Sequence, residues 1–301
     1  MRRIRRIWRN RVLYLMLLIP LSMLILFRYV PMYGVQIAFK NYQPSDTIRT
    51  APWVGLRYVQ KFFESYNFWT IMMNTLTIGV YSLATFFCAP TLALCVNYLT
   101  NRRFQKTVQT ISYLPHFIST VVMCSIILQI FDARSGLFNA FTGLFGVASR
   151  NYMGIPGAFK HIYIWTSIWQ DVGYASIIYI ASLASVSPEL HEAAMIDGAT
   201  LLKRIRHVDL PSILPTMSIL LIMRCGQVLN VGYEKAYLLQ NSMNIDASEV
   251  ISTYVYKQGL TSGLPQYSYA SAIGLFVSLI NLILLLAVNR ISGRLSGSSL
   301  F

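Results

Sequence analysis

Two residues of opposite charge interrupt stretches of the sequence that are otherwise uncharged. Asp171 is the single charge within residues 162–184, and Arg224 is the single charge within residues 214–232. An unpaired charge at the centre of a membrane helix costs at least about 2.5–3.5 kcal/mol, so such residues usually face a partner or a polar cavity. At about 1.5 Å per residue, both lie about 20 Å into their helices from the same side. We therefore predict that Asp171 and Arg224 form an ion pair or line one cavity.

Aromatic and amide side chains occur close to both charges in the sequence. If the protein moves a carbohydrate, its pathway needs both kinds, because aromatic faces cover the C–H groups of a sugar and polar side chains bind its hydroxyls. Anchoring at the membrane interface and helix packing explain the aromatic residues equally well. The candidates for a substrate pathway are Trp169, Asp171, Tyr174, Arg224, Gln227 and Asn230.

Arg224 admits two interpretations. Its guanidinium could bind the carboxylate of a uronate sugar through two parallel hydrogen bonds. Alternatively, Arg224 and Asp171 could be a structural clamp between two helices, which is the simpler interpretation. If the protein does move a carbohydrate, replacing Arg224 with alanine separates the two, because loss of transport of acidic sugars alone indicates recognition, whereas loss of assembly indicates a clamp.

The sequence carries no motif for catalysis, metal binding or nucleotide binding. The run His191-Glu192-Ala193-Ala194-Met195 is close to the HExxH zinc motif, but methionine replaces the second histidine that the metal requires. No phosphate-binding loop of the GxxxxGK[ST] type occurs. The four cysteines show no CxxC spacing. We therefore expect no catalytic residue, no metal site and no cofactor in this chain.

The composition indicates an integral membrane protein. Of the 301 residues only 12% are charged, about half of the ~25% in soluble domains, and 55% are hydrophobic. A helix that crosses a bilayer needs about 20 apolar residues. The first apolar run lacks the small-residue site that follows a signal peptide, so we expect it to be retained. Six spans are predicted, the second with a kink at Pro90: 12–30, 68–98, 107–131, 162–184, 214–232 and 258–289.

Lysine and arginine mark one side of the membrane. Six arginines precede the first span, and with six crossings the basic clusters at 102–106, 203–206 and 290–294 fall on the same side. Because cytoplasmic loops carry the basic excess, both termini are predicted to be cytoplasmic. The net charge of +14 fits contact with anionic membrane lipid, and no interleaved aromatic pattern suggests nucleic acid.

The cytoplasmic segment between the fourth and fifth spans has the signals of a helix–turn–helix. Ser187 is a natural N-cap, and Pro188 suits the first helical position. Gly198 can adopt the left-handed conformation that ends a helix. A second helix is expected over about 199–208, with Leu210-Pro211 ending it before the fifth span.

This segment resembles the EAA loop of bacterial ABC importer permeases. The family pattern is Glu-Ala-Ala, three residues, Gly, nine residues, then Ile-x-Leu-Pro, and the sequence keeps this spacing with Val208 where isoleucine is commoner. The resemblance implies that a separate ATPase docks on the loop and drives transport. The coupling residues that it implies are Glu192, Ala193, Ala194, Asp197, Gly198, Leu210 and Pro211.

The resemblance extends over most of the chain. Segments around 31–42, 113–119, 189–199 and 248–256 are similar to the LplB-type branch of maltose-permease-like carbohydrate permeases. This implies an all-α integral membrane protein with six transmembrane helices and the MetI-like fold of type I ABC importer permeases. It also implies a non-catalytic permease subunit in the bacterial inner (cytoplasmic) membrane that carries a carbohydrate, with an oligosaccharide expected and an acidic one open.

The same resemblance implies partners and two site residues. The partners are a second homologous permease, two copies of a cytoplasmic ATPase that binds ATP and Mg²⁺, and an extracellular solute-binding lipoprotein. In maltose-type relatives a tyrosine and a tryptophan before the Glu-Ala-Ala motif belong to the sugar site, and these positions match Tyr174 and Trp169. The relatives' asparagines in the following span align with Val228 and Val231, so Gln227 and Asn230 are one residue away and that half of the site stays open.

An ion-gradient-driven secondary transporter is the alternative function. It predicts inverted repeats and paired broken helices, which the sequence does not show, and an intramembrane enzyme lacks a catalytic constellation.

Asp246 and Glu249 have the spacing of a capping box for a short external helix. The predicted division is a basic cytoplasmic N-terminus (1–11), the first transmembrane helix (12–30), an external segment (31–67), a five-helix core (68–290) with the coupling loop 187–211 and an external helix 247–257, and a cytoplasmic tail (291–301).

Overall fold

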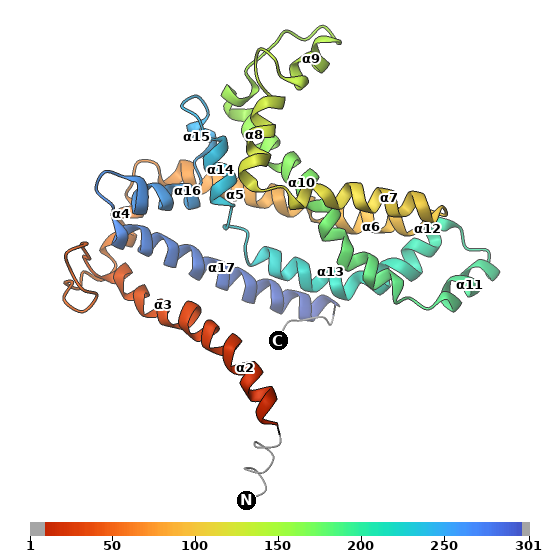
Figure 1. The fold of residues 1–301 in the computed structure, drawn as a ribbon, viewed down its shortest axis with the longest axis horizontal. Helices are drawn as coiled ribbons and strands as arrows, with labels where there is room; N and C mark the ends of the chain where they lie inside the picture. Colours follow the sequence, from red (N-terminus) through yellow and green to blue (C-terminus); the bar gives the residue numbers. More distant parts are fainter. Residues whose placement is uncertain (1–9, 297–301) are drawn as a thin grey trace, which may run out of the picture. The chain divides into compact units, whose positions relative to one another are not determined.

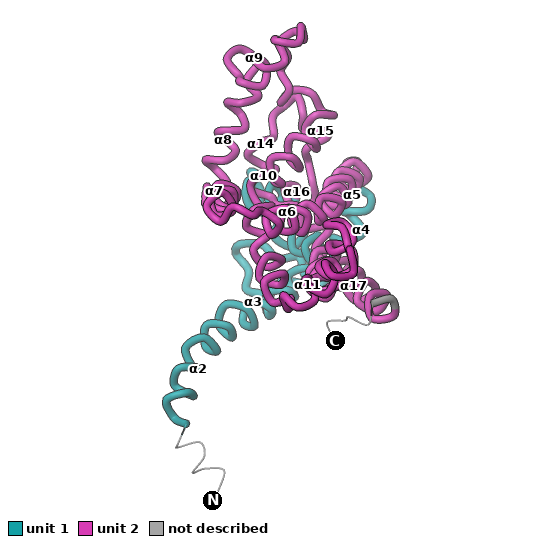
Figure 2. Tube along the Cα trace, turned by 90° about the vertical axis from the view of Figure 1, so that its right-hand side faces the viewer, with its two compact units in different colours: residues 1–65, 255–276 teal, residues 66–254, 277–301 magenta. Residues whose placement is uncertain are grey.

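The computed structural model describes residues 10–296. Within this range every regular element is a helix, apart from one antiparallel bridge between Lys40 and Trp53. Most of the predicted basic N-terminus and part of the predicted tail lie outside the described residues. The chain divides into two compact units, Met1–Ser65 with Val255–Phe276 and Tyr66–Tyr254 with Val277–Phe301 (Figure 2).

The first unit begins with a nearly continuous helical run, Arg11–Phe39 (Figure 1). Pro31 has no N–H for the carbonyl four residues earlier, which explains why the helix changes type ahead of it. No side chain of the first part is buried, as expected for a helix surrounded by lipid. The predicted external segment 31–67 is therefore still helical up to Phe39. The run consists of α2 (Arg11–Leu24), a π turn (Ile25–Tyr29), α3 (Val30–Met32) and a 3₁₀ helix (Tyr33–Phe39).

Aromatic packing holds the rest of the first unit together. It contains α4 (Arg57–Phe63), a π turn (Lys257–Thr261) and the first part of α17 (Tyr267–Ser296). Phe62 is fully buried, and its ring meets that of Phe276 edge-on at 6.0 Å between centroids. The neighbouring Phe63 contacts the same ring at 5.2 Å. These rings fix α4 against α17.

In the second unit, α5 (Phe68–Ala84) and α6 (Cys88–Asn97) form one 30-residue span. A 3₁₀ turn over Thr85–Phe87 separates them. Pro90 follows in α6, and it has no N–H for the carbonyl of Phe86, four residues earlier. The irregularity predicted from the proline therefore occurs about one turn before it.

The predicted span 107–131 is broken into two helices. One runs over Arg102–Phe117 as α7 (Arg102–Tyr113) with a 3₁₀ end, the other is α8 (Thr120–Ile130), and they are bent by 102°. Pro115 lies in the 3₁₀ end, and Ser119 is the N-cap of α8, its hydroxyl accepting from the Val122 N–H at 3.4 Å. The stretch therefore contains a sharp bend that the sequence prediction did not include, because the absence of charge hid these stop and start signals.

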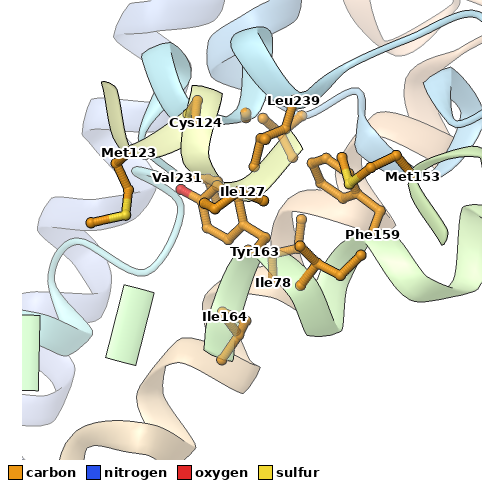
Figure 3. Close-up of a cluster of buried hydrophobic side chains, with 13 residues drawn as sticks. Ile78, Met123, Cys124, Ile127, Met153, Phe159, Tyr163, Ile164, Val231 and Leu239 are labelled. Carbon is orange, nitrogen blue, oxygen red and sulfur yellow. The ribbon is translucent and has the colours of Figure 1, made fainter. Parts of the chain in front are cut away.

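Helix α10 (Pro156–Ala184) packs against α6, α7 and α13 (Figure 1). Its first half supplies Phe159 and Tyr163 to a buried core that also contains Ile78 of α5 and Ile127 of α8 (Figure 3). Two small elements precede it, α9 (Leu137–Gly143) and a 3₁₀ turn (Tyr152–Gly154). This core fixes the helices that carry the polar residues described below.

The segment after α10 departs from the sequence prediction at its second half. After α11 (Pro188–Ile196), the chain forms one 25-residue helix from α12 (Leu201–Arg204) through a π turn (Ile205–Asp209) to α13 (Leu210–Cys225). The prediction that Leu210-Pro211 ends a helix was wrong. The Leu210 N–H bonds to the Ile205 carbonyl five residues earlier, and this wider turn accommodates the proline.

The predicted external helix 247–257 is likewise two helices, α15 (Ile245–Ser248) and α16 (Ile251–Tyr256), which follow α14 (Tyr233–Leu239). Asp246 lies inside α15 and Glu249 is extended after it, so the two form no capping box. The fully buried Asn244 instead holds this segment through hydrogen bonds. Its amide donates to the carbonyls of Met153 and Leu239 at 2.9 and 3.1 Å.

Four helical segments in the described range are long and apolar enough to cross a membrane, and the bent pair α7–α8 could make a fifth. The remaining predicted span lies within α10, which has 29 residues but is not among them. Lys160, Gln170 and Asp171 make α10 more polar than the others. The four are Arg11–Phe39, Phe68–Asn97, Leu201–Cys225 and Tyr267–Arg294.

Candidate functional site

The predicted coupling loop begins with a well-formed short helix. The Ser187 hydroxyl accepts from the Glu189 N–H at 3.3 Å, and Pro188 occupies the first turn of α11, both as predicted. Gly198 has φ +70° and ends the helix. Its N–H bonds to the Met195 carbonyl, and the next N–H bonds to the Ala194 carbonyl at 2.9 Å. This is a Schellman motif, in which only glycine is free of strain at the left-handed position.

Helix α11 carries exposed apolar side chains. Leu190 and Met195 are 54% and 52% exposed, and Ile196 is 87% exposed. Of the predicted coupling residues, Ala194 is half-buried and the others are exposed: Glu192, Ala193, Asp197, Gly198, Leu210 and Pro211. A narrow helix with this surface can enter a groove on another protein.

A buried carboxylate ties α11 to the membrane helices. Asp209 is fully buried, and its Oδ1 lies 3.4 Å from Nε2 of His191 on α11. Its Oδ2 accepts from the Tyr98 hydroxyl, at the end of α6, at 2.5 Å. The Arg204 guanidinium lies 5.7 Å from the centre of the Tyr98 ring. No sequence pattern pointed to Asp209, and this tether was not predicted.

Asp171 and Arg224 line the same polar cavity, which confirms that part of the prediction. The cavity has a volume of about 250 Å³, and a smaller one of about 60 Å³ is also lined by both residues and by Ser82. The two charges do not form the ion pair that was the other option. The Arg224 guanidinium donates to the Ser82 hydroxyl at 3.0 Å, and Asp171 Oδ1 lies 3.0 Å from Nδ1 of His116.

Gln227 and Asn230 line the cavity together with Val228 and Val231, the residues at the family's asparagine positions. The turn after α13 therefore presents both sets to the cavity. Asn230 is held by the amide of Asn281, which donates to its side-chain oxygen at 3.1 Å. Gly79 of α5 allows the turn to approach closely, because a Cβ there would lie 2.1 Å from a backbone oxygen of the turn.

Tyr174 and Trp169 do not line the cavity, although both were candidates. Tyr174 stacks on the His116 ring at 3.9 Å and an interplanar angle of 7°, so it contacts the histidine that binds Asp171. Trp169 is 50% exposed on this chain. His116 and Ser82 were missed as site residues, although His116 stands in a segment that carried the family resemblance.

Lys235 is a second cation close to these residues, and the sequence analysis did not single it out. It is 7% exposed, and its Nζ donates to the Ser167 hydroxyl at 2.7 Å and to the Tyr163 carbonyl at 3.3 Å. Burial lowers the pKa of Lys235 to about 8, an effect that the charge of Asp171 opposes. Ser167 itself lines the cavity, so Lys235 supports the cavity wall.

No group of three or more His, Cys, Asp or Glu side chains in the described range could hold a metal ion. The four cysteines are free thiols. The chemistry of the cavity is therefore that of hydrogen bonds and charge.

Comparisons with known proteins identify the family of this chain. Residues 89–297 match the family "Binding-protein-dependent transport system inner membrane component". The chain is 38% identical to the polygalacturonan/rhamnogalacturonan transport system permease protein YteP of Bacillus subtilis (strain 168), over 97% of this chain and 91% of that protein. It is 36% identical to protein LplB of the same organism, over 97% and 92%.

Solved structures show the same fold. A bacterial ABC transporter that imports the acidic polysaccharide alginate matches with a TM-score of 0.89 and 36% identity, covering 98% of this chain and 100% of that one. A second structure of a bacterial alginate ABC transporter, in complex with a periplasmic protein bound to an alginate pentasaccharide, matches with a TM-score of 0.89 and 35% identity. The all-α, MetI-like fold expected from the sequence is confirmed.

These matches leave no place for a secondary transporter or an intramembrane enzyme. The matched family spans most of the chain, and the relatives are ABC transporter permeases, whose ATPase is a separate subunit. The apolar helices agree with a multi-pass membrane protein. The chain belongs to the family of binding-protein-dependent transport system inner membrane components, as a non-catalytic ABC permease subunit for sugars.

Proposed function

We propose that this chain is the permease of an ATP-driven importer for an oligosaccharide that carries uronate carboxylates. The proposal rests on the interaction partners of the Arg224 guanidinium. Its guanidinium lines a polar cavity and donates to the Ser82 hydroxyl, and no carboxylate in the described range forms an ion pair with it. An arginine that is not neutralised by the protein can bind a carboxylate of the substrate through two hydrogen bonds.

The arrangement around Asp171 supports this role. His116 contacts Asp171, and Tyr174 stacks on His116, so the acid is engaged away from the guanidinium. Gln227 and Asn230 offer amide groups to sugar hydroxyls in the same cavity. YteP is named for transport of polygalacturonan and rhamnogalacturonan, and the matching alginate transporter imports an acidic polysaccharide, so these two relatives carry polymers that contain acidic sugars.

The coupling loop supports the ATP-driven part of the proposal. The exposed face of α11 would dock on a cytoplasmic ATPase that binds ATP and Mg²⁺. Because Asp209 contacts both His191 and Tyr98, movement of α11 would be passed to α6 and α13. The assembly would contain two ATPase copies, a second homologous permease and an extracellular solute-binding lipoprotein, in the cytoplasmic membrane of a bacterium with both termini inside.

Reconstitution tests the proposal. The complex is purified from its native membrane, its subunits are identified, and uptake into ATP-loaded proteoliposomes is measured with trigalacturonate and with its carboxyl-reduced analogue. We expect an ATPase and a second permease to co-purify, and uptake of trigalacturonate to exceed that of the analogue by at least about tenfold, which corresponds to about 1.4 kcal/mol. Equal uptake of both sugars, or uptake without ATP, contradicts the proposal.

A further inference from the structure

A second cavity, with different walls, lies entirely within the first unit. Its volume is about 540 Å³, within the range of about 300–1,000 Å³ that is usual for ligand pockets. It is lined by the 41–44 loop, by α4 and by residues 264–269 at the start of α17. None of these residues belongs to the Arg224 cavity, whose lining lies in the second unit.

The charged side chains that line this pocket are all basic. Arg57 and Lys61 stand four residues apart on α4, so their side chains lie on the same face of the helix. No acidic residue lines the pocket. Arg57 is exposed, and Lys61 is held with its Nζ 2.8 Å from the Gln266 side-chain oxygen and 4.7 Å from the centre of the Tyr269 ring. The pocket therefore attracts an anion.

The remaining walls have the groups that sugars need. The half-buried Tyr42 and Tyr58 bring aromatic rings to the pocket, Asn41 and Gln266 bring amides, and Tyr269 is buried beneath Lys61. The Tyr58 hydroxyl donates to the Asn41 side-chain oxygen at 2.6 Å, which leaves the amide N–H₂ of Asn41 for another acceptor.

The 41–44 loop is held in place by contacts with the start of α17. The Tyr42 N–H donates to the Ser268 hydroxyl at 2.9 Å, and Ser268 is buried. The Tyr42 ring meets the Tyr267 ring edge-on at 6.2 Å. A preformed pocket lowers the entropy that is lost on binding.

We propose that this pocket is a second binding site for a uronate-containing oligosaccharide, with Arg57 and Lys61 binding carboxylates and the tyrosines covering sugar faces. This inference rests on the proposed function, and in the proposed orientation the pocket lies on the external side. There it holds an acidic sugar chain outside the membrane, separately from the Arg224 cavity. A phosphate headgroup of a lipid shares the negative charge but offers no sugar ring to the tyrosines.

Binding of trigalacturonate to the purified complex tests this site. The complex is placed in phosphatidylcholine nanodiscs and carries Arg224→Gln, which removes the carboxylate site of the central cavity. We expect trigalacturonate still to bind, and Arg57→Gln to weaken this binding by about tenfold, as for the loss of one charge-assisted hydrogen bond. Lys61→Gln is expected to act in the same direction, with Lys61→Arg restoring affinity.

Arg49→Gln is the matched control, since Arg49 is an exposed arginine of the same unit outside the pocket. It should leave the affinity unchanged, and the carboxyl-reduced analogue should be insensitive to Arg57→Gln. Unchanged trigalacturonate binding in Arg57→Gln overturns the proposal. So does an effect of Arg57→Gln that is abolished when phosphatidylglycerol replaces part of the lipid, because the pocket then takes a lipid phosphate.

The two proposals fail in different ways. If the wild-type complex imports trigalacturonate but Arg57→Gln binds it normally, only the external site is refuted. If the wild-type complex imports the carboxyl-reduced analogue as well as trigalacturonate, the proposed function itself is refuted.

Discussion

The coupling loop and the Arg224 cavity are built in opposite ways. The cap and the end of α11 are set by neighbours within a dozen residues, from Ser187 to Ala199. The cavity depends on pairs that are distant in the sequence, such as Ser82 with Arg224, 142 residues apart, and His116 with Asp171, 55 apart. The loop is thus formed by contacts that are local in the sequence, and the cavity by tertiary contacts. Changes in the loop should affect every substrate alike, whereas changes in the cavity should depend on the substrate.

The largest expected effect tests the cavity. Arg224→Gln removes the guanidinium from a position where a charged hydrogen bond contributes about 1.5–3 kcal/mol. We expect uptake of trigalacturonate by proteoliposomes to fall about ten- to hundredfold, and the preference over its carboxyl-reduced analogue to disappear. Arg224→Lys, which keeps the charge but not the planar pair of donors, should recover part of the preference.

The opposite result would restore the clamp interpretation. If Arg224→Gln prevents the permease from assembling with its partners in the membrane, as measured by size-exclusion chromatography of the extracted complex, then the arginine acts in structure. Ser82 is its one hydrogen-bond partner in the described range, so Ser82→Ala should then cause a similar loss of assembly.

The second effect tests the loop. A Cβ at Gly198 would meet no atom within 4 Å, so a substitution there acts chiefly through φ +70°. A residue with a Cβ costs about 1–2 kcal/mol in this conformation, and a change of that size shifts a local equilibrium about 5–30-fold. We expect Gly198→Val to lower uptake by about that factor for acidic and carboxyl-reduced sugars alike, together with the ATP hydrolysis that the binding protein stimulates.

Two matched variants isolate the backbone effect. Gly198→Asn should retain most activity, because asparagine tolerates the left-handed region. Gly143→Ala should be neutral, since Gly143 also has open space around it but an ordinary φ. Full uptake and full ATPase stimulation in Gly198→Val would show that α11 needs no defined end.

These two regions also explain what could be predicted from the sequence. Ser187 and Gly198 form hydrogen bonds to near neighbours in the sequence, and Pro188 acts through its fixed φ, so their residue types were sufficient. Asp171 and Arg224 could be placed in one cavity because helical rise gives their depth, but rise gives no rotation about the helix axis. The partners His116 and Ser82 depend on that rotation and on the angle between α7 and α8, which the local signals at Pro115 and Ser119 do not set.

Three prolines show where prediction of helix ends from residue type alone fails. Pro115 belongs to a real break, Pro90 to a short 3₁₀ irregularity, and Pro211 to a helix that continues through a π turn. The missing N–H is the same in all three. The proline alone therefore does not decide whether a helix breaks, tightens or continues.

The smallest effect concerns Lys235, which lies behind the cavity wall. Burial lowers its pKa from 10.5 to about 8, so between these pH values the folded chain has released a proton that the unfolded chain still holds. Stability should therefore rise as the pH is raised from about 8 towards 10, and be lowest below 8, where the buried amine is charged. In thermal unfolding of the purified complex we expect the midpoint to rise by about 2–4 °C over this range. Lys235→Met should abolish the rise, while Lys106→Met, which removes an exposed lysine, should keep it. An undiminished slope in Lys235→Met would show that other groups cause it and that the wild-type amine stays charged behind the cavity wall over this pH range.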